Sequence, residues 1–526
     1  MKVEKNKRMA LINEEIKQHL SPTERKPGKP RILLCTPEIT ELPEGMGNAA
    51  NLIAAKGGGL GDISAGLVRH INESQEFELH IVIPKYDLTI QDIAKITSKQ
   101  MDRLAVFLSG RGIHLVNDSA FSYLKNPYSE SVMHPPVRRS LVFQQHIINY
   151  LLDAIQPDVV HCNDWMTGLL PAAARAKGIK SLFTLHNIFT EKQTMMEIES
   201  SGIRPMDFMD WLYFETYPQN IRENLSEHFE KTKVDFITTG IFAADYFNTV
   251  SETFLQELKN NMYPDIVSRP IYEMIKLKCD QQRAVGIQNA PIDTMNSLQQ
   301  RDIINFDRDS VMEKKAENKL LFQQRVGLPE YADKPLFFWP NRLYYQKGPD
   351  LLIDHMDYFL KKYDMQIAVV ANGDSALVAQ LEKFSKKYPQ VAYRTFDEAL
   401  SNLGKAAADF ILMPSRYEPC GLPQMEALHF GTLPVVRATG GLKDTIQQMD
   451  VAHSKGNGFT FLFADREGLD YGFQEAISFY NLPYAVKKQH LQRVMDIAKN
   501  KFNLSRTAGK YMEIYRQLIR EKKDGV

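Results

Sequence analysis

The length, composition and charge of the chain exclude several classes of protein. At 526 residues the chain is too long for one hydrophobic core, so at least two domains are expected. Its 64 Lys and Arg residues balance its 64 Asp and Glu residues, so no net charge favours nucleic acid or an anionic membrane as a partner. A balanced chain suits a sugar or another small-molecule ligand instead.

The cysteines and the charged N-terminal segment bear on the cellular compartment. Cys35, Cys162, Cys279 and Cys420 form no C-x-x-C pair, which predicts reduced thiols rather than a disulfide framework or a zinc site. The first thirty residues lack the apolar core of a signal peptide, and no apolar run approaches the ~18 residues of a membrane span. We therefore expect a cytoplasmic protein without membrane contact, or a plastid-like location if a leader is removed.

Short apolar runs alternate with amphipathic stretches in the first half of the chain, after a segment over residues 1–30 that is expected to be flexible. The runs expected to be parallel strands are Arg31–Thr36, Leu79–Pro84, Asp158–Cys162, Ser181–Leu185 and Tyr246–Val250. Apolar residues at helical spacing follow, as in Thr167–Lys177 and Ser251–Asn260. This alternation predicts a doubly wound, Rossmann-like α/β domain over residues 31–280.

A second series of the same kind predicts a second Rossmann-like domain over residues 281–505. Its expected strands are Leu336–Pro340, Gln366–Ala371, Val391–Thr395, Phe410–Met413, Leu433–Arg437 and Phe459–Phe463. Residues 281–318 are polar and show few strand signals, so we interpret them as the hinge. Residues 506–526 form a separate element, because apolar residues recur at helical spacing over Thr507–Lys522.

A glycine-rich loop follows the first predicted strand. It reads Lys56-Gly57-Gly58-Gly59-Leu60-Gly61-Asp62 and opens a predicted helix. Glycine lets the backbone approach a ligand closely, the N–H groups at a helix N-terminus bind phosphate, and Lys56 adds a positive charge. Such a loop is weak evidence by itself.

Polar side chains follow two further strands, at the end of the sheet where ligands bind in open α/β folds. His161-Cys162-Asn163-Asp164-Trp165 ends one strand, and His186-Asn187 follows the next. Trp165 could instead be a core anchor and Asp164 a helix N-cap. A lone histidine such as His186 is also often structural, so both readings stay open on the residues alone.

Two cations precede a helix in the second half of the chain. Arg342 and Lys347 lie five residues apart in the motif Arg342-Leu343-Tyr344-Tyr345-Gln346-Lys347-Gly348. Cations are poorly placed at the positive N-terminus of a helix unless an anion lies between them. The motif therefore predicts a bound anion, such as a diphosphate, rather than a solvated surface.

Residues 409–445 are the most informative stretch of the chain. The predicted strand Phe410–Met413 leads into a turn with Glu418 and Gly421 and then a helix from Leu422. The next predicted strand, Leu433–Arg437, leads into Thr439-Gly440-Gly441, which opens another helix. Two glycine-containing turns that feed helices place backbone N–H groups around one crevice, as in phosphate-binding α/β proteins.

Together these motifs resemble one enzyme family. Residues 414–422 are similar to the pattern P-S-R-[FY]-E-P-C-G-L, and residues 342–348 match R-L-x-x-Q-K-G. Residues 56–62 are similar to K-T-G-G-L-[AG]-D, and residues 161–165 to H-x-H-D-W. These are patterns of glycosyltransferase family 5, the bacterial glycogen synthases and plant starch synthases. The resemblance implies the GT-B fold, two doubly wound domains that face each other across a deep cleft, with a last helix that crosses back to the first domain.

The resemblance also implies an activity and a set of site residues. It implies a retaining glucosyltransferase that extends an α-1,4-glucan from ADP-glucose or UDP-glucose, with no metal or other cofactor and no nucleic-acid or membrane partner. The implied catalytic residues are His186, Glu418, Arg342, Lys347 and Asp164. The implied donor-binding residues are Lys56, Gly58, Gly59, Asn289, Arg342, Lys347, Cys420, Gly421, Leu422, Glu426, Thr439, Gly440 and Gly441. The implied residues of the acceptor and sugar cleft are Glu38, Asp62, Asp164 and Asn187.

Glu418 and Glu426 have seven residues between them. With Glu418 on the turn and Glu426 two turns into the following helix, the first carboxylate can meet the sugar and the second the ribose. Glu426 restores the E-x7-E spacing of the broader retaining GT-B enzymes, although many glycogen synthases have an aromatic residue or histidine there. The alternative is that Glu426 is a solvent-facing helix residue.

The chain departs from the family pattern in three places. Gly57 replaces a threonine, an insertion occupies Pro43–Ile53, and Asn289-Ala290-Pro291 has an extra residue and lacks a glycine. Two alternatives therefore stay open: a retaining GT-B transferase with a non-glucan acceptor, and a degenerate glucan-binding or regulatory paralogue. A nicotinamide-dependent dehydrogenase is disfavoured, because the G-x-G-x-x-G fingerprint is absent.

Overall fold

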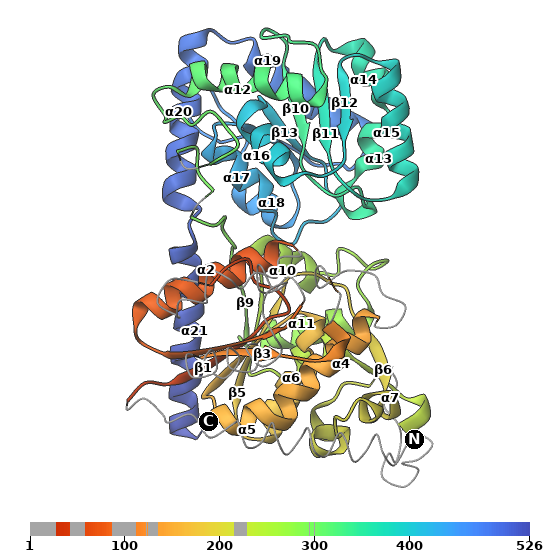
Figure 1. The fold of residues 1–526 in the computed structure, drawn as a ribbon, viewed down its shortest axis with the longest axis vertical. Helices are drawn as coiled ribbons and strands as arrows, with labels where there is room; N and C mark the ends of the chain where they lie inside the picture. The colour runs from red at the N-terminus through yellow and green to blue at the C-terminus, as the bar shows by residue number, and fades with distance from the viewer. Residues whose placement is uncertain are drawn as a thin grey trace, which may run out of the picture. The chain divides into compact units, whose positions relative to one another are not determined.

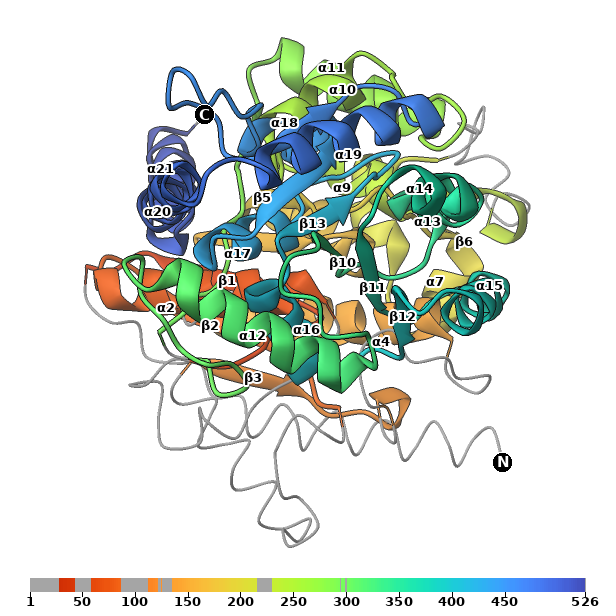
Figure 2. The ribbon, with the colours of Figure 1, turned by 90° about the horizontal axis from the view of Figure 1, so that it is seen from above.

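The computed structural model describes residues 28–42, 58–86, 112–121, 124, 135–214, 229–293, 295–298 and 300–525. The chain divides into two compact units (Figures 1 and 2). The first contains the described residues up to Thr249, then Glu257–Ile287 and the chain from Thr507 onwards; the second contains Val250–Gln256 and Gln288–Arg506. The sequence did not indicate that residues 250–256 join the second unit.

Seven parallel strands form the main sheet of the first unit, in the order β3-β2-β1-β4-β5-β8-β9. They are β1 (Arg31–Cys35), β2 (Glu78–Pro84), β3 (Ile113–Val116), β4 (Val159–Asn163), β5 (Lys180–Leu185), β8 (Tyr246–Thr249) and β9 (Ala284–Gly286). The strand order changes direction between β1 and β4. These two strands therefore flank the switch point, where open α/β sheets bind their ligands.

Helices pack against this sheet, and β1, β2 and β4 are buried along their whole length, although each also contains polar residues. The α-helices are α2 (Gly59–Ser74), α4 (Pro136–His146), α5 (Leu152–Ile155), α6 (Leu170–Ala176), α7 (Met195–Ser200), α9 (Phe236–Ala243), α10 (Glu252–Lys259), α11 (Arg269–Asp280) and α21 (Leu504–Asp524). Helix α10 begins in residues of the second unit and ends in the first.

The last helix, α21, is fastened to the first sheet by a buried polar network. His161 of β4 is hydrogen-bonded through Nδ1 to the Tyr515 hydroxyl at 2.7 Å and through Nε2 to the Thr184 hydroxyl at 2.7 Å. Asn248 of β8 donates from Nδ2 to the Tyr511 hydroxyl at 3.1 Å. The histidine of the His161–Trp165 motif therefore has a structural role, which is to bind the C-terminal helix.

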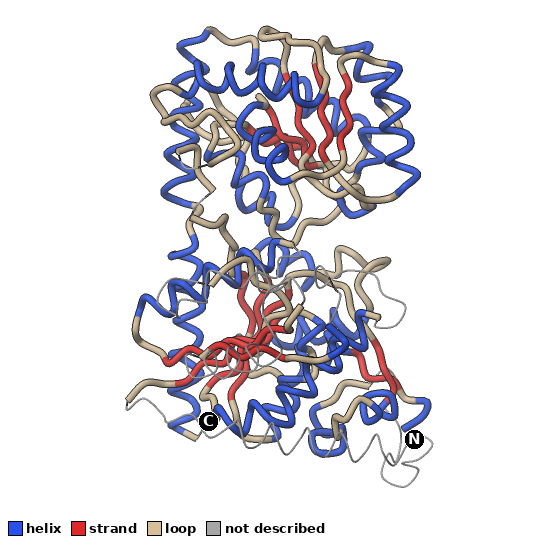
Figure 3. Tube along the Cα trace, in the orientation of Figure 1, coloured by secondary structure: helices blue, strands red, loops and turns tan. Residues whose placement is uncertain are grey.

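Six parallel strands form the sheet of the second unit, in the order β12-β11-β10-β13-β14-β15 (Figure 3). They are β10 (Leu336–Trp339), β11 (Gln366–Val370), β12 (Val391–Arg394), β13 (Phe410–Met413), β14 (Leu433–Arg437) and β15 (Phe459–Phe461). The order changes direction between β10 and β13, which sets the switch point of this unit.

Aromatic residues fill the core of the second unit between its sheet and its helices. Phe337 of β10 stacks on Phe410 of β13 with ring centroids 4.8 Å apart, and Phe473 of α19 meets Phe337 edge-on. The α-helices are α12 (Val311–Val326), α13 (Pro349–Ile353), α14 (Met356–Lys362), α15 (Ser375–Lys387), α16 (Glu398–Ala407), α17 (Pro423–His429), α18 (Gly440–Thr445), α19 (Arg466–Tyr480) and α20 (Tyr484–Lys501).

The structure adds strands that the sequence did not reveal. The edge strands β3 and β9 of the first sheet have only four and three residues; His114 lies within β3 and Gly286 ends β9, so neither shows a clear apolar pattern. A small antiparallel pair, β6 (Lys192–Thr194) and β7 (Lys233–Asp235), lies outside the main sheet. Residues 281–318, interpreted as the hinge, contain β9 and the first half of α12, and the chain passes from the first unit to the second between Ile287 and Gln288.

Two further expectations concern thiols and membranes. Cys35, Cys162 and Cys420 are buried and Cys279 is partly exposed, and all four are free thiols. Among the helices of the described ranges, none combines the length and the apolar character that a bilayer span requires.

Candidate active site

The switch point of the first unit brings together three residues predicted as site residues. Glu38 follows β1, Asp164 follows β4 and His186 follows β5. Neighbouring parallel strands end at the same edge of the sheet, so residues more than a hundred positions apart in the sequence meet there.

Asp164 has an uncommon backbone conformation, with φ 56° and ψ −175°. Such a conformation costs about 1–3 kcal/mol for a residue other than glycine and persists only when the surroundings impose it. Here the side chain supplies the constraint, because Oδ1 accepts hydrogen bonds from the backbone N–H of His186 at 2.6 Å and of Asn187 at 3.3 Å. Asp164 therefore fixes the start of the loop that carries His186, and it does not act as the N-cap considered above, since no side-chain cap bond forms.

Burial determines the charge state of this pair. Burial raises the pKa of Asp164 to about 7, although its two backbone hydrogen bonds lower it. Burial also lowers the pKa of His186 to about 3, so the imidazole is neutral at neutral pH. The first unit thus presents a neutral histidine beside a carboxyl group that titrates near pH 7.

Asn163 fixes the tautomer of His186. Its Nδ2 donates to the carbonyl of Cys35 at 3.0 Å, which directs Oδ1 towards His186 Nε2 at 2.9 Å. An amide oxygen only accepts, so Nε2 carries the hydrogen and Nδ1 presents its lone pair. Asn163 was not predicted as a site residue, although its place beside Asp164 at a strand end was the available signal.

Glu38 and Asp62 support the glycine-rich loop. Glu38 is fully buried, and its Oε2 accepts a hydrogen bond from the backbone N–H of Gly58 at 2.6 Å, where α2 begins. Asp62, in the first turn of α2, accepts a hydrogen bond from the Thr40 hydroxyl at 2.6 Å. Lys56, Gly57 and the insertion Pro43–Ile53 lie outside the described residues, so the predicted phosphate contact of Lys56 stays a prediction.

We expect the first unit to lose stability as the pH falls from about 6.5 towards 3. Burial lowers the pKa values of His114, His161 and His186 from 6.5 to about 3, so in this range the unfolded chain binds protons that the folded unit excludes. Asp164 acts in the opposite sense, because its raised pKa makes the folded unit bind a proton between pH 3.8 and about 7. Because three groups outweigh one, the urea concentration at the unfolding midpoint should decrease as the pH is lowered from 6.5 to 4.

His114→Gln, which replaces one of these three buried histidines, should flatten the pH dependence of the urea midpoint. A midpoint that does not change between pH 6.5 and pH 4 would contradict the assignment.

The switch point of the second unit is organised around one ion pair. Lys347 Nζ lies 2.5 Å from Glu418 Oε2, and the Ser415 hydroxyl donates to the same oxygen at 3.1 Å. Lys347 follows β10 and Glu418 follows β13, so the two sequence motifs meet across the switch point. Ser415 was not predicted, although it lies within the P-S-R-[FY]-E-P-C-G-L pattern.

Arg342 is exposed and has a different environment. Its guanidinium lies 5.6 Å from the centre of the Tyr344 ring, and no ion pair to it is found in the described part of the chain. By contrast, Arg416 makes a bidentate ion pair with Asp350, with N–O distances of 2.6 and 2.5 Å. Arg342 is therefore a cation of this edge that, within the described residues, is not neutralised by an ion pair and can bind an external anion.

Close backbone packing explains Gly441, and a left-handed backbone conformation explains Gly421. A Cβ on Gly441 would lie 2.1 Å from the carbonyl oxygen of Cys420, and Gly421 has φ 70°. The N–H of Gly441 donates to the carbonyl of Glu418 at 3.0 Å, which joins the two turns. Helix α18 begins at Gly440 with Thr439 as its N-cap residue, as predicted from Thr439-Gly440-Gly441.

Glu426 differs from the prediction in position and in environment. Helix α17 begins at Pro423 rather than Leu422, so Glu426 lies in its first turn and not two turns in. Its side chain is buried and paired with Lys405, Nζ to Oε2 at 2.6 Å, so it is not a solvent-facing residue. Lys405 was missed, because nothing in the sequence links positions 405 and 426 before folding.

Asn289 is buried, and its backbone N–H lies 3.4 Å from the carbonyl of Val250. Its Oδ1 has no hydrogen-bond partner in the described part of the structure, which is uncommon for a buried amide. The neighbouring Gln288 donates from Nε2 to the Cys420 sulfur at 3.1 Å. The altered Asn289 turn therefore still packs against the glycine turn at Cys420 and Gly421.

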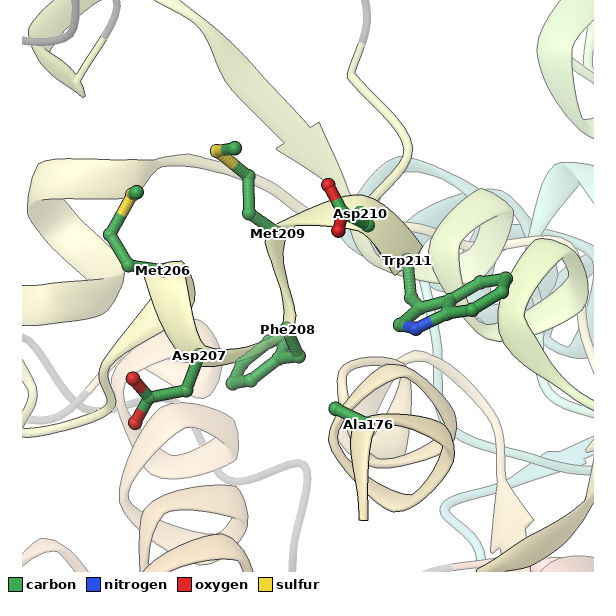
Figure 4. Close-up of a pocket in the computed structure, with 7 residues that line it drawn as sticks. All are labelled: Ala176, Met206, Asp207, Phe208, Met209, Asp210 and Trp211. Atoms are coloured by element: carbon green, nitrogen blue, oxygen red, sulfur yellow. The ribbon is translucent and has the colours of Figure 1, made fainter. Parts of the chain in front are cut away.

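A hollow of about 510 Å³ on the first unit is lined by none of the strand-end residues described above (Figure 4). It is lined by Ala176 of α6 and by residues 206–211. The carboxylates of Asp207 and Asp210 lie apart and do not point toward one another, and the guanidinium of Arg175 lies 4.1 Å from the centre of the Trp211 ring. These groups do not converge on one ligand, so the switch points remain the candidate active site.

Two Rossmann-like units with polar side chains at both switch points define the GT-B class of glycosyltransferases. The catalytic domain of starch synthase IV from Arabidopsis thaliana, solved with ADP and acarbose, has this fold, with a TM-score of 0.73 over 94% of this chain and 100% of that chain at 23% identity. A family model of the starch synthase catalytic domain matches residues 31–266, and one of group 1 glycosyl transferases matches residues 322–483. The chain is 30% identical to the glycogen synthase of Thermotoga petrophila, over 88% of this chain and 96% of that protein, and belongs to the glycogen synthase family.

A second relative gives the same result. The glycogen synthase of Pseudothermotoga lettingae is 30% identical over 496 residues, which are 89% of this chain and 97% of that protein. The similarity therefore spans both units, and the chain is a hexosyltransferase.

Proposed function

We propose that this glucan-extending glycosyltransferase takes glucose from ADP-glucose or UDP-glucose and adds it, with retention of configuration, to the end of an α-1,4-glucan. The observation that carries the proposal is the Lys347–Glu418 ion pair at the switch point of the second unit. It joins two motifs of the family at the edge of the sheet where a nucleotide sugar would bind.

The second unit supplies the groups for the diphosphate. One N–H of the Lys347 ammonium donates to Glu418, so two N–H donors remain for phosphate oxygens. Arg342 offers a guanidinium that can bind phosphate in a bidentate manner. These two cations would offset the negative charge that develops on the leaving diphosphate, a task that a metal ion performs in other enzymes.

The first unit supplies the groups for the transferred sugar. A neutral His186 beside Asp164 can hydrogen-bond glucose hydroxyls without adding a positive charge near the anomeric carbon. The family resemblance places the His186 carbonyl near that carbon, where its dipole would stabilise the positive charge of the transition state.

The proposed reaction is a front-side displacement. The bond between the anomeric carbon and the phosphate oxygen breaks, and the bond to the acceptor hydroxyl oxygen forms on the same face. The leaving phosphate takes the proton of that hydroxyl, so no protein base is needed. Charge stabilisation by Lys347 and Arg342 is then the main contribution of the protein.

The test is an incorporation assay with the purified chain, glycogen, and labelled ADP-glucose or UDP-glucose, each with and without EDTA. We expect label in chains that an α-1,4-specific amylase releases, with one donor preferred and a rate that EDTA does not change. A large loss restored by magnesium or manganese would contradict the metal-independent mechanism.

Two other outcomes would support the alternatives. Label that enters a small acceptor but not glycogen would indicate a GT-B transferase with a non-glucan acceptor. Binding of ADP or UDP without transfer to any acceptor would indicate the regulatory paralogue.

A further inference from the structure

The carboxylate of Glu426 is held by a residue from a neighbouring helix. Glu426 lies in the first turn of α17, and Lys405 lies in the last turn of α16. The two helices are in contact in the second unit (Figure 1). Lys405 Nζ lies 2.6 Å from Glu426 Oε2, and the side chains are 9% and 10% exposed, so solvent screens this ion pair little.

Both the side-chain ammonium and the backbone of Lys405 are held by further hydrogen bonds. Its ammonium also donates to Asn402 Oδ1, one turn earlier on α16, at 3.3 Å. Its backbone carbonyl accepts a hydrogen bond from the Thr432 hydroxyl. A buried stem, a second acceptor and an anchored backbone leave the ammonium little freedom, so it defines where the carboxylate points.

The other oxygen of Glu426 remains available. Oε1 makes no hydrogen bond to any described residue, and it is not among the buried side-chain atoms that lack a partner. His429 follows on the same helix, and burial lowers its pKa, so it adds no second cation at neutral pH. One oxygen held by a cation and one left open is a suitable acceptor for a sugar hydroxyl.

We propose that Lys405 is a positioning residue for the donor nucleotide: it orients Glu426 so that Oε1 accepts a hydrogen bond from a ribose hydroxyl. This inference rests on the proposed function, because it assigns the ribose of the nucleotide sugar to the second unit. It adds a residue that does not itself touch the ligand and that lies on a helix outside the sequence motifs.

The experiment is a calorimetric titration of ADP, UDP and 2′,3′-dideoxy-ADP into five proteins: the wild type, Lys405→Met, Lys405→Arg, Glu426→Gln and the double variant Lys405→Met/Glu426→Gln. Lys405→Met should weaken ADP binding about tenfold, because the carboxylate loses its orientation, and binding of dideoxy-ADP should change little. Lys405→Arg should restore most of the affinity. The double variant should bind ADP no more weakly than Glu426→Gln, since the two residues act as one unit.

A matched control separates positioning from stability. Lys319 is another buried lysine of the second unit. Its Nζ lies 2.8 Å from Oδ2 of Asp409, which directly precedes β13, at the end of the sheet opposite the switch-point turns. Lys319→Met should lower the melting temperature without changing the affinity for ADP. In the transfer assay, Lys405→Met should raise KM for the nucleotide sugar and change kcat less than threefold.

The outcomes are distinguishable. If the wild type binds ADP or UDP and transfers glucose, but Lys405→Met binds as the wild type does, this inference is wrong and the proposed function stands. Equal losses for ADP and dideoxy-ADP would also overturn it. If the wild type neither binds a nucleoside diphosphate nor transfers glucose, the proposed function fails first. Should Lys405→Met not fold, the double variant, which leaves no unpaired buried charge, still tests the coupling against Glu426→Gln.

Discussion

Replacement of Lys347 by alanine is expected to lower turnover by on the order of 10²-fold or more, because it removes charge stabilisation that is realised mainly in the transition state. It should also lower the melting temperature, since Glu418 is buried and, among the described residues, would keep only Ser415 as a side-chain hydrogen-bond partner. Assays well below the melting temperature separate the two effects. The double variant Lys347→Ala/Glu418→Gln, which removes the buried charge, should recover stability but not turnover.

Arg342→Ala is the informative companion to this variant. Arg342 is exposed and has no ion pair within the described ranges, so its loss should leave the melting temperature unchanged and still reduce turnover by about 10²-fold. The control is Lys387→Ala, which removes an exposed lysine paired with Asp357 on the surface of the same unit. That variant should behave as the wild type. Near-normal activity of Arg342→Ala would show that this residue does not bind the diphosphate.

The second large effect is expected at His186. His186→Ala should lower turnover by about 10²–10³-fold, because it removes a neutral hydrogen-bonding group at the proposed sugar site. Affinity for ADP should be almost unchanged, since the proposal places His186 at the transferred sugar and not at the diphosphate. Steady-state rates and calorimetric titration of the same preparation would check both parts.

Variants of Asp164 show whether the residue acts as a hydrogen-bond acceptor that supports the His186 loop or through its negative charge. Asp164→Asn keeps an oxygen that accepts from the N–H groups of His186 and Asn187, so it should retain much more activity than Asp164→Ala. Asp164→Gly would relieve the backbone strain at φ 56° but lose that acceptor, so it should be more stable than Asp164→Ala and equally inactive. If Asp164→Asn were as inactive as Asp164→Ala, the negative charge itself would be required.

The sequence predicted the elements well where the pattern is long and the environment uniform. Strands such as β13 and β14 were predicted with the observed bounds, because strands buried on both faces are mostly apolar and these runs stand out in the sequence. β3 and β9 were missed, although the equally short edge strands β12 and β15 were predicted; His114 interrupts β3 and β9 ends in a glycine, so neither shows a clear strand pattern. The motif containing Arg342 and Lys347 indicated an anion site because its cations precede a helix, and the structure adds which of the two is already paired.

The sequence by itself determined the two α/β domains, the family resemblance and the identity of the motifs, because each depends on local runs of residues. The tertiary structure alone decided the partners. Lys347 pairs with Glu418, which is 71 positions away in the sequence. Lys405 pairs with Glu426 because helices α16 and α17 pack against each other. It also decided that the Asp164 side chain holds the start of the His186 loop by a hydrogen bond. The uncommon backbone conformation of Asp164 is not indicated by any local sequence pattern. The physical reason is the same in each case: parallel strands bring distant chain segments to one edge of a sheet, and burial there makes each charge depend on the partner it meets.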